Sequence, residues 1–255
     1  MERENKNFAA CFVGPPGSGK TSAAKALYDM YKKLGRNTLF LNLDPGNDEI
    51  KFNIDFDICD YITITDIMKE QNLGPNGALM FCFSEIKNSE DTIVSEITKM
   101  LKEFTFIVID SPGQVELYTH SQDFRDFLKS LSVRLNFNYC TVNLVDIALL
   151  RTSESLLGQT LMSLATMIRM DCPAINVISK YDLIFQSDLD FDPDNFDFDS
   201  ILISRGVPKP LHTAVVNLIN MYDLVSFEKL SINDETTIIE VLEVIDKCLG
   251  TEWHL

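Results

Sequence analysis

The chain alternates between short, continuous hydrophobic runs and longer stretches in which apolar residues recur at helical spacing. The clearest helical stretch covers 22–34, where apolar residues return every three or four positions. Continuous apolar runs are typical of parallel strands that are buried on both faces. We therefore expect an α/β fold, with a doubly wound, mainly parallel sheet and helical insertions. The predicted strands are 8–13, 38–43, 104–109, 140–145, 174–178 and 225–230.

Polar residues follow several of these runs. Asp44 comes after the second run, Asp110 after the third, Asp146 after the fourth, and the segment 179–182 after the fifth. One such aspartate could simply cap a helix or form a turn. The carboxyl ends of parallel strands meet at one edge of a sheet, and ligands bind there. We therefore expect these residues to share one site.

A glycine-rich segment directly follows the first predicted strand. It reads Gly14-Pro-Pro-Gly-Ser-Gly-Lys-Thr21, which satisfies the pattern G-x-x-x-x-G-K-[ST] between a strand and a helix. A chance glycine turn would lack that context, so the segment predicts a phosphate-binding loop. Its backbone N–H groups and the helix N-terminus would face phosphate oxygens. Lys20 would contact the β and γ phosphates, and Thr21 would supply a hydroxyl ligand to Mg²⁺. The predicted nucleotide contacts are Gly17, Ser18, Gly19, Lys20, Thr21 and Ser22.

Length and charge limit the possible partners. The 255 residues fit one domain, 1–255, with insertions at about 45–103 and about 186–212. The formal net charge of −16 argues against a broad nucleic-acid-binding surface, which would need to be basic. The charged N-terminal residues and the lack of a long apolar run predict no signal peptide and no membrane span. We expect a cytoplasmic protein that does not bind nucleic acid directly. The acidic segment 188–200 is interpreted as a solvated surface insertion, with an interaction motif or a cation site as alternatives.

Asp110-Ser-Pro-Gly113 fits the D-x-x-G element of GTPases. The aspartate would hold Mg²⁺ through water, and the N–H of Gly113 would sense a γ-phosphate. Four residues alone make a weak pattern. Its position after a strand, in a chain with a phosphate loop, makes it more specific.

The segment Ser179-Lys180-Tyr181-Asp182 is close to the guanine-binding pattern N/T-K-x-D. The Asp182 carboxylate would accept both N–H groups on the guanine edge, which adenine lacks, and the Lys180 stem would cover the base. Serine at the first position departs from the pattern. An ordinary surface Lys and Asp would be the alternative, but the two motifs above favour guanine over adenine.

With these motifs and the segment Leu73-Gly74-Pro75-Asn76-Gly77, the chain resembles the GPN-loop GTPases. Without the family, Gly-Pro-Asn-Gly would be only a turn. The resemblance covers nearly the whole chain and is strongest to the second of three eukaryotic paralogues. Further segments that carry it are 42–45, 110–117, 163–167 and 222–227.

The resemblance implies a dimer-dependent P-loop GTPase of the signal-recognition/MinD-like class, in which 45–103 is the GPN-loop insertion. Gly74, Pro75 and Asn76 would form the GPN loop, and Asn76 would act at the partner's nucleotide. Asp44 would orient or deprotonate the attacking water. The other residues that the resemblance implies are Gln114 and Glu116, which position that water, and Ser226, near the last base-contacting loop.

The family also implies a biological role. The partner would be an identical chain or a GPN-loop paralogue, and the clients would be RNA polymerase subunits or assembly factors. The protein would act in RNA polymerase biogenesis and nuclear import, from the cytoplasm with shuttling to the nucleus. The residues alone leave two alternatives open. One is a nucleotide-stabilised scaffold. The other, an ATP-dependent P-loop kinase, is disfavoured because 186–212 contains only Arg205 and Lys209 as basic residues.

Overall fold

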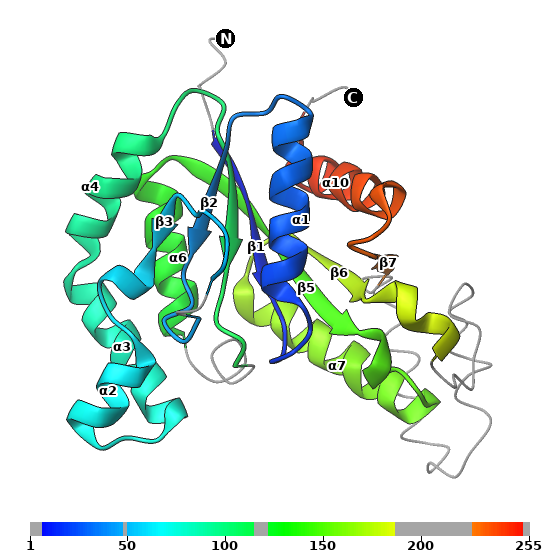
Figure 1. The fold of residues 1–255 in the computed structure, drawn as a ribbon, viewed down its shortest axis with the longest axis horizontal. Coiled ribbons are helices and arrows are strands. Elements are labelled where there is room, and N and C mark those ends of the chain that lie inside the picture. Colours follow the sequence, from blue (N-terminus) through cyan, green and yellow to red (C-terminus); the bar gives the residue numbers. More distant parts are fainter. Residues whose placement is uncertain (1–6, 48–49, 115–121, 187–225, 252–255) are drawn as a thin grey trace.

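The computed structural model describes residues 7–47, 50–114, 122–186 and 226–251 of the chain. Within these ranges it has a seven-stranded, fully parallel sheet with helices on both faces (Figure 1). The predicted α/β fold with a parallel sheet is therefore confirmed. The strand order is β3-β2-β4-β1-β5-β6-β7. The strands are β1 Asn7–Val13, β2 Thr38–Asn42, β3 Phe56–Asp57, β4 Phe106–Asp110, β5 Phe137–Asp146, β6 Ala174–Ser179 and β7 Phe227–Lys229.

Helices cover the two faces unequally. The described helices are α1 Lys20–Lys33, α2 Ile64–Gln71, α3 Pro75–Asn88, α4 Glu90–Met100, α6 Asp123–Arg134, α7 Ser153–Met170 and α10 Glu235–Leu249. Helices α1 and α10 pack on one face, and α3, α4 and α6 contribute to the core on the other (Figure 1). Short 3-10 helices are η1 Ile58–Asp60, η2 Ile147–Leu149 and η3 Tyr181–Gln186.

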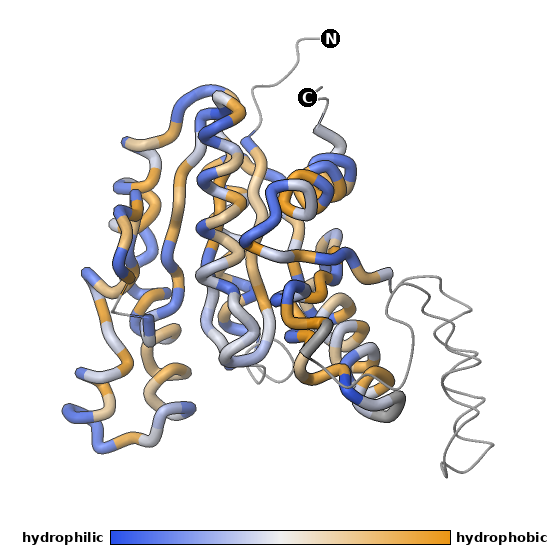
Figure 2. Tube along the Cα trace, turned by 45° about the vertical axis from the view of Figure 1, so that its right-hand side comes forward, coloured by the Kyte–Doolittle hydropathy of each residue, from blue (hydrophilic) through white to orange (hydrophobic). Residues whose placement is uncertain are grey.

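The central strand β1 is completely buried beyond its first two residues. Ala9 and Cys11 face one core, whereas Ala10 and Phe12 face the other, as the alternation of side chains along a strand requires. Figure 2 shows the hydrophobic strands enclosed between helices whose outer surfaces are hydrophilic. Among the described helices, none is both long and apolar enough to cross a bilayer.

All six predicted hydrophobic runs contain a strand, but their boundaries differ. The third strand begins at Phe106 because Phe104 adopts a left-handed conformation, with φ of 56°, and is exposed. The sequence did not predict β3, whose two residues are too few to show a pattern. The insertion 45–103 contains β3, η1, α2, α3 and α4. The acidic segment 188–200 lies outside the described residues.

Candidate functional site

A cavity of about 650 Å³ opens at the carboxyl edge of the central strands. Segments from six parts of the sequence surround it, as expected for a site at the strand ends of a doubly wound sheet. Its lining residues are Pro16, Gly17, Gly19, Lys20, Thr21, Ser22, Asp44, Gly46, Asn47, Ile64, Thr65, Leu79, Pro112, Gly113, Gln114 and Lys180.

The turn after β1 brings the backbone close to its neighbours. Gly14 has φ of 145°, and a Cβ there would lie 2.6 Å from the carbonyl oxygen of Leu144. Only glycine fits this position, because a side chain would collide with backbone atoms. The turn leads directly into α1, whose positive N-terminal end faces the cavity.

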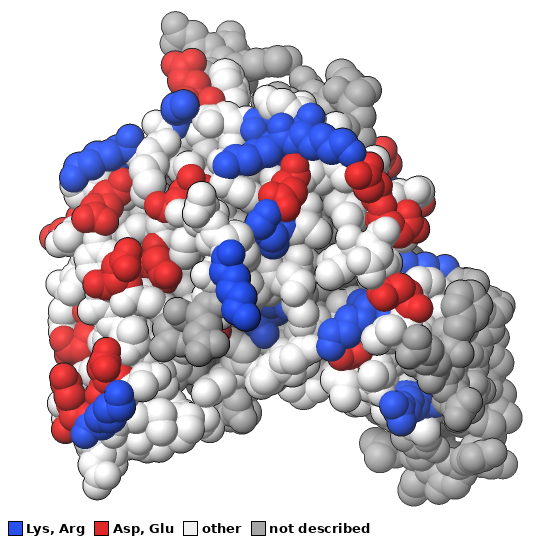
Figure 3. Space-filling view, viewed as in Figure 1, with Lys and Arg blue, Asp and Glu red and all other residues white. Residues whose placement is uncertain are grey.

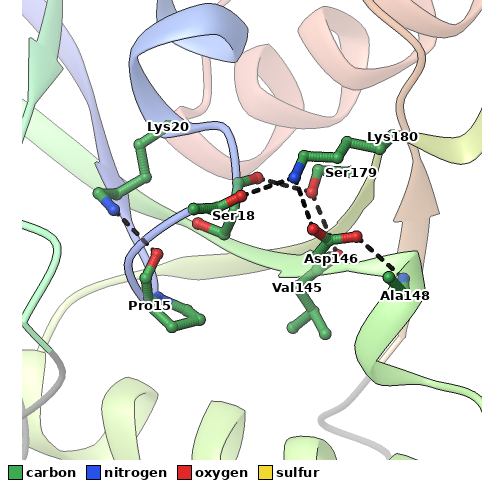
Figure 4. A network of polar contacts seen from close by, with 9 residues as sticks. Pro15, Ser18, Lys20, Val145, Asp146, Ala148, Ser179 and Lys180 are labelled. Carbon is green, nitrogen blue, oxygen red and sulfur yellow. Dashed lines mark hydrogen bonds and ion pairs between the residues drawn. The ribbon is translucent and has the colours of Figure 1, made fainter.

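Lys20 is buried at the first position of α1, and its Nζ donates a 3.0 Å hydrogen bond to the carbonyl of Pro15 (Figure 4). Burial lowers the pKa of Lys20, while the carboxylates of Asp110 and Asp44 act in the opposite direction. Nearby, the hydroxyl of Ser18 is buried and has no hydrogen-bond partner among the described residues. The loop therefore holds a cation and a spare hydroxyl beside an open cavity.

Thr21 and Asp110 form the candidate metal site. The Thr21 hydroxyl donates a 2.6 Å hydrogen bond to Oδ2 of Asp110. The other carboxylate oxygen, Oδ1, is buried and has no hydrogen-bond partner in the described part of the chain. Burial, together with the nearby Asp44 carboxylate, raises the pKa of Asp110 to about 6. A hydroxyl beside a buried carboxylate with an unpaired oxygen fits a hard cation such as Mg²⁺, which prefers oxygen ligands.

Asn47 joins this pair, although the sequence analysis did not identify it. Its Nδ2 lies 3.1 Å from the Thr21 hydroxyl oxygen and 3.2 Å from Oδ2 of Asp110. Asn47 comes three positions after Asp44, in the turn that follows β2. The only available signal was a polar residue close behind a strand-end aspartate, and that pattern is too common to be specific.

Asp44 lies two residues beyond the end of β2, half-buried at the cavity wall. Its Oδ1 accepts a 2.9 Å hydrogen bond from the N–H of Gly46. Burial raises the pKa of Asp44, opposed by the backbone amides of Gly46 and Gly113 and by the charge of Lys20. Gln114 is half-buried in the same lining. Glu116 lies outside the described residues.

Gly113 approaches the phosphate loop closely. A Cβ on this residue would lie 3.0 Å from Nζ of Lys20 and 3.4 Å from Cα of Pro16. A side chain here would push Lys20 Nζ aside by a few tenths of an ångström, so glycine permits the close approach of the backbone after β4 to the loop. The D-x-x-G segment and the phosphate loop share one cavity wall.

The end of β6 is tied to the phosphate loop. Lys180, with φ of 56°, donates hydrogen bonds of 2.7 Å to the carbonyl of Gly17 and 2.6 Å to Oδ2 of Asp146. The hydroxyl of Ser179 donates a 2.7 Å hydrogen bond to the carbonyl of Ser18 (Figure 4). Serine at the first motif position thus supplies a contact that holds the two loops together.

Asp182 is exposed in η3, outside the cavity lining. Its Oδ2 accepts a 3.4 Å contact from Nδ2 of Asn233, which lies in the loop between β7 and α10. The N–H of Tyr181 donates a 3.1 Å hydrogen bond to the carbonyl of Leu230 at the start of that loop. The segment 230–234 therefore flanks the candidate base-binding residue, and the sequence analysis did not identify it.

Ser226 lies away from this group. It precedes β7, and its carbonyl accepts a 3.4 Å hydrogen bond from Nδ2 of Asn176 in the middle of β6. Phe227 pairs with Asn176 in a parallel register, so Ser226 lies toward the amino end of the strands. The placement of Ser226 beside the base-contacting loop does not agree with this geometry. The loop at the carboxyl end of β7 is 230–234.

Asn76 also lies outside the cavity lining. It is the second residue of α3, after the cap residue Gly74 and Pro75, and all three are exposed. Leu79, one turn later, does line the cavity. The helix therefore approaches the site with its body, while Asn76 at its tip faces outward.

Comparisons with known proteins identify relatives of this chain. The model of a family described as conserved hypothetical ATP-binding proteins matches residues 12–251. The chain is 34% identical to GPN-loop GTPase 2 of Saccharomyces cerevisiae over 95% of its own length and 74% of the relative. It is 33% identical to GPN-loop GTPase QQT1 of Arabidopsis thaliana, covering 95% and 85% of the two chains.

One solved structure has a similar overall fold. It is the apo form of a GTPase from Pyrococcus abyssi, with a TM-score of 0.75 and 19% identity. The similarity covers 96% of this chain and 98% of that protein. At this level of identity the comparison supports the fold.

Proposed function

Because this chain belongs to the GPN-loop GTPase family, we propose that its cavity binds GTP with Mg²⁺ and that a second subunit completes the hydrolytic site. The observation that carries this proposal is the convergence of Lys20, the Thr21–Asp110 pair and Asp44 on one cavity. A phosphate-binding cation, metal-binding oxygens and a candidate base are the parts that phosphoryl transfer to water requires.

We propose that the base is guanine, although the matching family model is described as ATP-binding. Asp182 supports guanine because a carboxylate can accept hydrogen bonds from both N–H groups on the guanine edge. Adenine offers no such pair, so its binding would leave the carboxylate unmatched. Titration with GTP and ATP tests this directly. Equal affinity for the two nucleotides would contradict the assignment.

The phosphate groups would bind Lys20 and the backbone N–H groups of the loop, including those of Gly17, Ser18 and Gly19. Thr21 and Asp110 would hold Mg²⁺, with Asp110 acting directly or through water. The metal would neutralise charge on the β and γ phosphates. Arrival of phosphate oxygens would give Lys20 a stronger acceptor than the carbonyl of Pro15, because an ionised acceptor makes the stronger hydrogen bond.

We propose that Asp44 orients the attacking water and accepts its proton. The water oxygen attacks the γ phosphorus, the bond to the β–γ bridging oxygen breaks, and GDP and inorganic phosphate leave. Burial of Asp44 supports this role, since it brings the pKa of the carboxyl closer to neutrality. Gln114 lines the same cavity and would help to position the water. Glu116 is proposed for that role from the family resemblance alone.

We propose that Asn76 acts on the nucleotide of the partner subunit. Its exposed position outside the cavity lining supports this, because the side chain is accessible to another molecule. The cap residue Gly74 has no side chain to occupy the first-turn N–H groups. An exposed amide at a positive helix end is suited to contact phosphate on another molecule.

Single-turnover cleavage of GTP tests these assignments. We expect Asp44→Asn to slow cleavage by about 10²-fold, the range for loss of a general base. Asp57→Asn is a matched control, since Asp57 accepts hydrogen bonds from Asn42 and Cys59 away from the cavity lining. Cleavage at the wild-type rate in Asp44→Asn would show that another group activates the water.

The biological role follows from the family resemblance. We propose that the chain forms one GTPase domain, 1–255, which pairs with itself or a paralogue and promotes RNA polymerase biogenesis and nuclear import from the cytoplasm. Depletion of the protein should leave newly made polymerase subunits in the cytoplasm, and the Asp44→Asn variant should fail to restore import. Rescue by that variant would instead support a scaffold that does not need hydrolysis.

A further inference from the structure

The side-chain nitrogen of Asn47 contacts the same two oxygens that we propose as metal ligands. Nδ2 lies 3.1 Å from Oγ1 of Thr21 and 3.2 Å from Oδ2 of Asp110. Thr21 and Asp110 are themselves only 2.6 Å apart, so the three polar atoms form a closed triangle. Asn47 thus contacts one oxygen of each residue that we propose as a metal ligand.

The donors and acceptors of Thr21 and Asp110 determine which end of the Asn47 amide faces these oxygens. The single proton of the Thr21 hydroxyl is donated to Asp110, so its oxygen is available to Asn47 only as an acceptor. The ionised Asp110 carboxylate can only accept. Both contacts therefore require the NH₂ group of Asn47, and the amide oxygen must point away from the pair.

The NH₂ group of Asn47 competes with a cation for the lone pairs of these two oxygens, even though Oδ1 of Asp110 is unpaired. The NH₂ group and Mg²⁺ are both electron-poor, so a cation held by the Thr21 hydroxyl and the Asp110 carboxylate would repel the NH₂ group. We propose that Asn47 is a placeholder for the cation, which stabilises Thr21 and Asp110 before metal binding and must release them when the metal binds. This inference rests on the proposed Mg²⁺ site and extends it to a residue that competes with the metal.

Release of Asn47 would affect the turn that carries Asp44. The backbone N–H of Asn47 donates a 3.1 Å hydrogen bond to the carbonyl of Asp44, which closes the turn. The carbonyl of Asn47 accepts a 3.2 Å hydrogen bond from Nδ2 of Asn42. The side chain of Asn47 is thus a further anchor of a turn that also positions the candidate base. Metal binding would replace that anchor and so change the restraint on Asp44.

Titration of the GDP complex with Mg²⁺ tests the proposal, with a fluorescent GDP analogue reporting metal binding. We expect Asn47→Ala to bind Mg²⁺ about tenfold more tightly than wild type, because two competing hydrogen bonds are gone. The larger Asn47→Leu, which leaves no cavity, should show the same direction. Asn53→Ala is the matched control, since Asn53 is exposed in the same connection and away from the cavity lining. We expect it to bind Mg²⁺ as wild type does.

Thermal unfolding of the nucleotide-free protein provides a second measurement. Asn47→Ala should have a lower Tm than wild type without metal. The difference between the two Tm values should become smaller when Mg²⁺ and GDP are present. Weaker Mg²⁺ binding in both Asn47 variants would overturn the proposal and make Asn47 a ligand. Unchanged affinity would overturn it by showing no competition. If wild type itself binds GDP with no dependence on Mg²⁺, the proposed metal site fails rather than the role of Asn47.

Discussion

The hydroxyl of Thr21 donates a 2.6 Å hydrogen bond to Asp110, a residue 89 positions later in the chain. The bond joins the first turn of α1 to the end of β4 and places a carboxylate where burial raises its pKa to about 6. Protonation would remove the charge that attracts a cation. We therefore expect Mg²⁺ affinity to fall as pH drops through about 6, measured by titration of the GDP complex at several pH values. Affinity independent of pH between 5 and 8 would contradict this.

Asp110 also predicts how the metal-free protein responds to pH. Its folded-state pKa of about 6 lies above the ordinary value of 3.8, so the native state binds this proton more tightly. The stabilisation that this proton gives the native state is fully present below pH 3.8 and is lost as pH rises through about 6. The free energy of unfolding falls by about 3 kcal/mol over that range. Asp110→Asn should flatten this part of the stability curve in urea unfolding, while it abolishes Mg²⁺ binding.

The contact between Asp182 and Asn233 predicts how the base site is maintained. Asn233→Ala should weaken GTP binding about threefold to tenfold, since it removes one partner of the Asp182 carboxylate. ATP binding should not change. Asp182→Asn should weaken GTP binding about 10²-fold and favour xanthosine triphosphate, whose base presents an acceptor to the new NH₂ group. Calorimetric titration with the three nucleotides measures both effects. Equal losses for GTP and ATP in Asn233→Ala would contradict a role in base selection.

Mixed dimers test the position of Asn76. In the proposed dimer, one subunit would carry Asn76→Ala and its partner Lys20→Ala, which disables nucleotide binding. Only the Asn76→Ala subunit then binds nucleotide, so action of Asn76 at the partner's site and action at its own site give different results. Action in trans predicts that the Asn76→Ala subunit keeps its activity when its partner retains Asn76. Activity in such mixed dimers, beside inactive Asn76→Ala homodimers, is the expected result. Loss of activity in both would instead place Asn76 at its own nucleotide.

A buried ion pair joins Arg36, in the connection between α1 and β2, to Asp246 in α10. Arg36 makes bonds of 2.9 and 2.5 Å to the two oxygens of Asp246, and both residues are buried. Removal of one partner leaves an unpaired buried charge, so Arg36→Met should cost about 3–5 kcal/mol of unfolding free energy. The exposed pair of Lys33 and Glu235 is the control, and Lys33→Met should cost less than about 1 kcal/mol. Similar losses in urea unfolding would mean that burial is not decisive here.

A charge map of the surface agrees with this distinction between pairs. In Figure 3, basic and acidic side chains mingle over the face that α1 occupies, where solvent screens them. Lys25 and Asp29 on α1 form such an exposed contact. Among these ion pairs, the largest effect on stability is therefore expected from Arg36 and Asp246.

The parts of the site that the sequence predicted share one property. Asp110 ends β4, Asp44 lies two residues beyond β2, and a short loop after β1 carries Lys20 and Thr21. The rule for parallel sheets brings such positions together at one edge. Local sequence was sufficient because the backbone itself delivers these residues to the edge. Their contacts needed no knowledge of how the helices pack.

Other parts depended on tertiary structure. Asn47 and Asn233 act through side chains on turns, and only the packing of those turns decides which atoms they meet. The strand β3 has two residues and therefore no periodicity to detect. Ser226 was predicted near the last base-contacting loop, but the short strand β7 begins just after it. That single boundary decides whether the residue lies at the carboxyl or the amino edge of the sheet.

Helix α3 is anchored in the core by Phe83 and carries Asn76 at its exposed N-terminal end. Phe83 is buried and packs edge-on against Phe124 of α6, with ring centroids 5.5 Å apart. Seven residues separate Phe83 from Asn76, a rise of about 10 Å. The number of residues between Phe83 and Asn76 therefore sets the direction in which Asn76 points around the helix axis. One residue inserted between them would turn Asn76 by about 100° around the axis, whereas four would nearly restore its direction about 6 Å farther out.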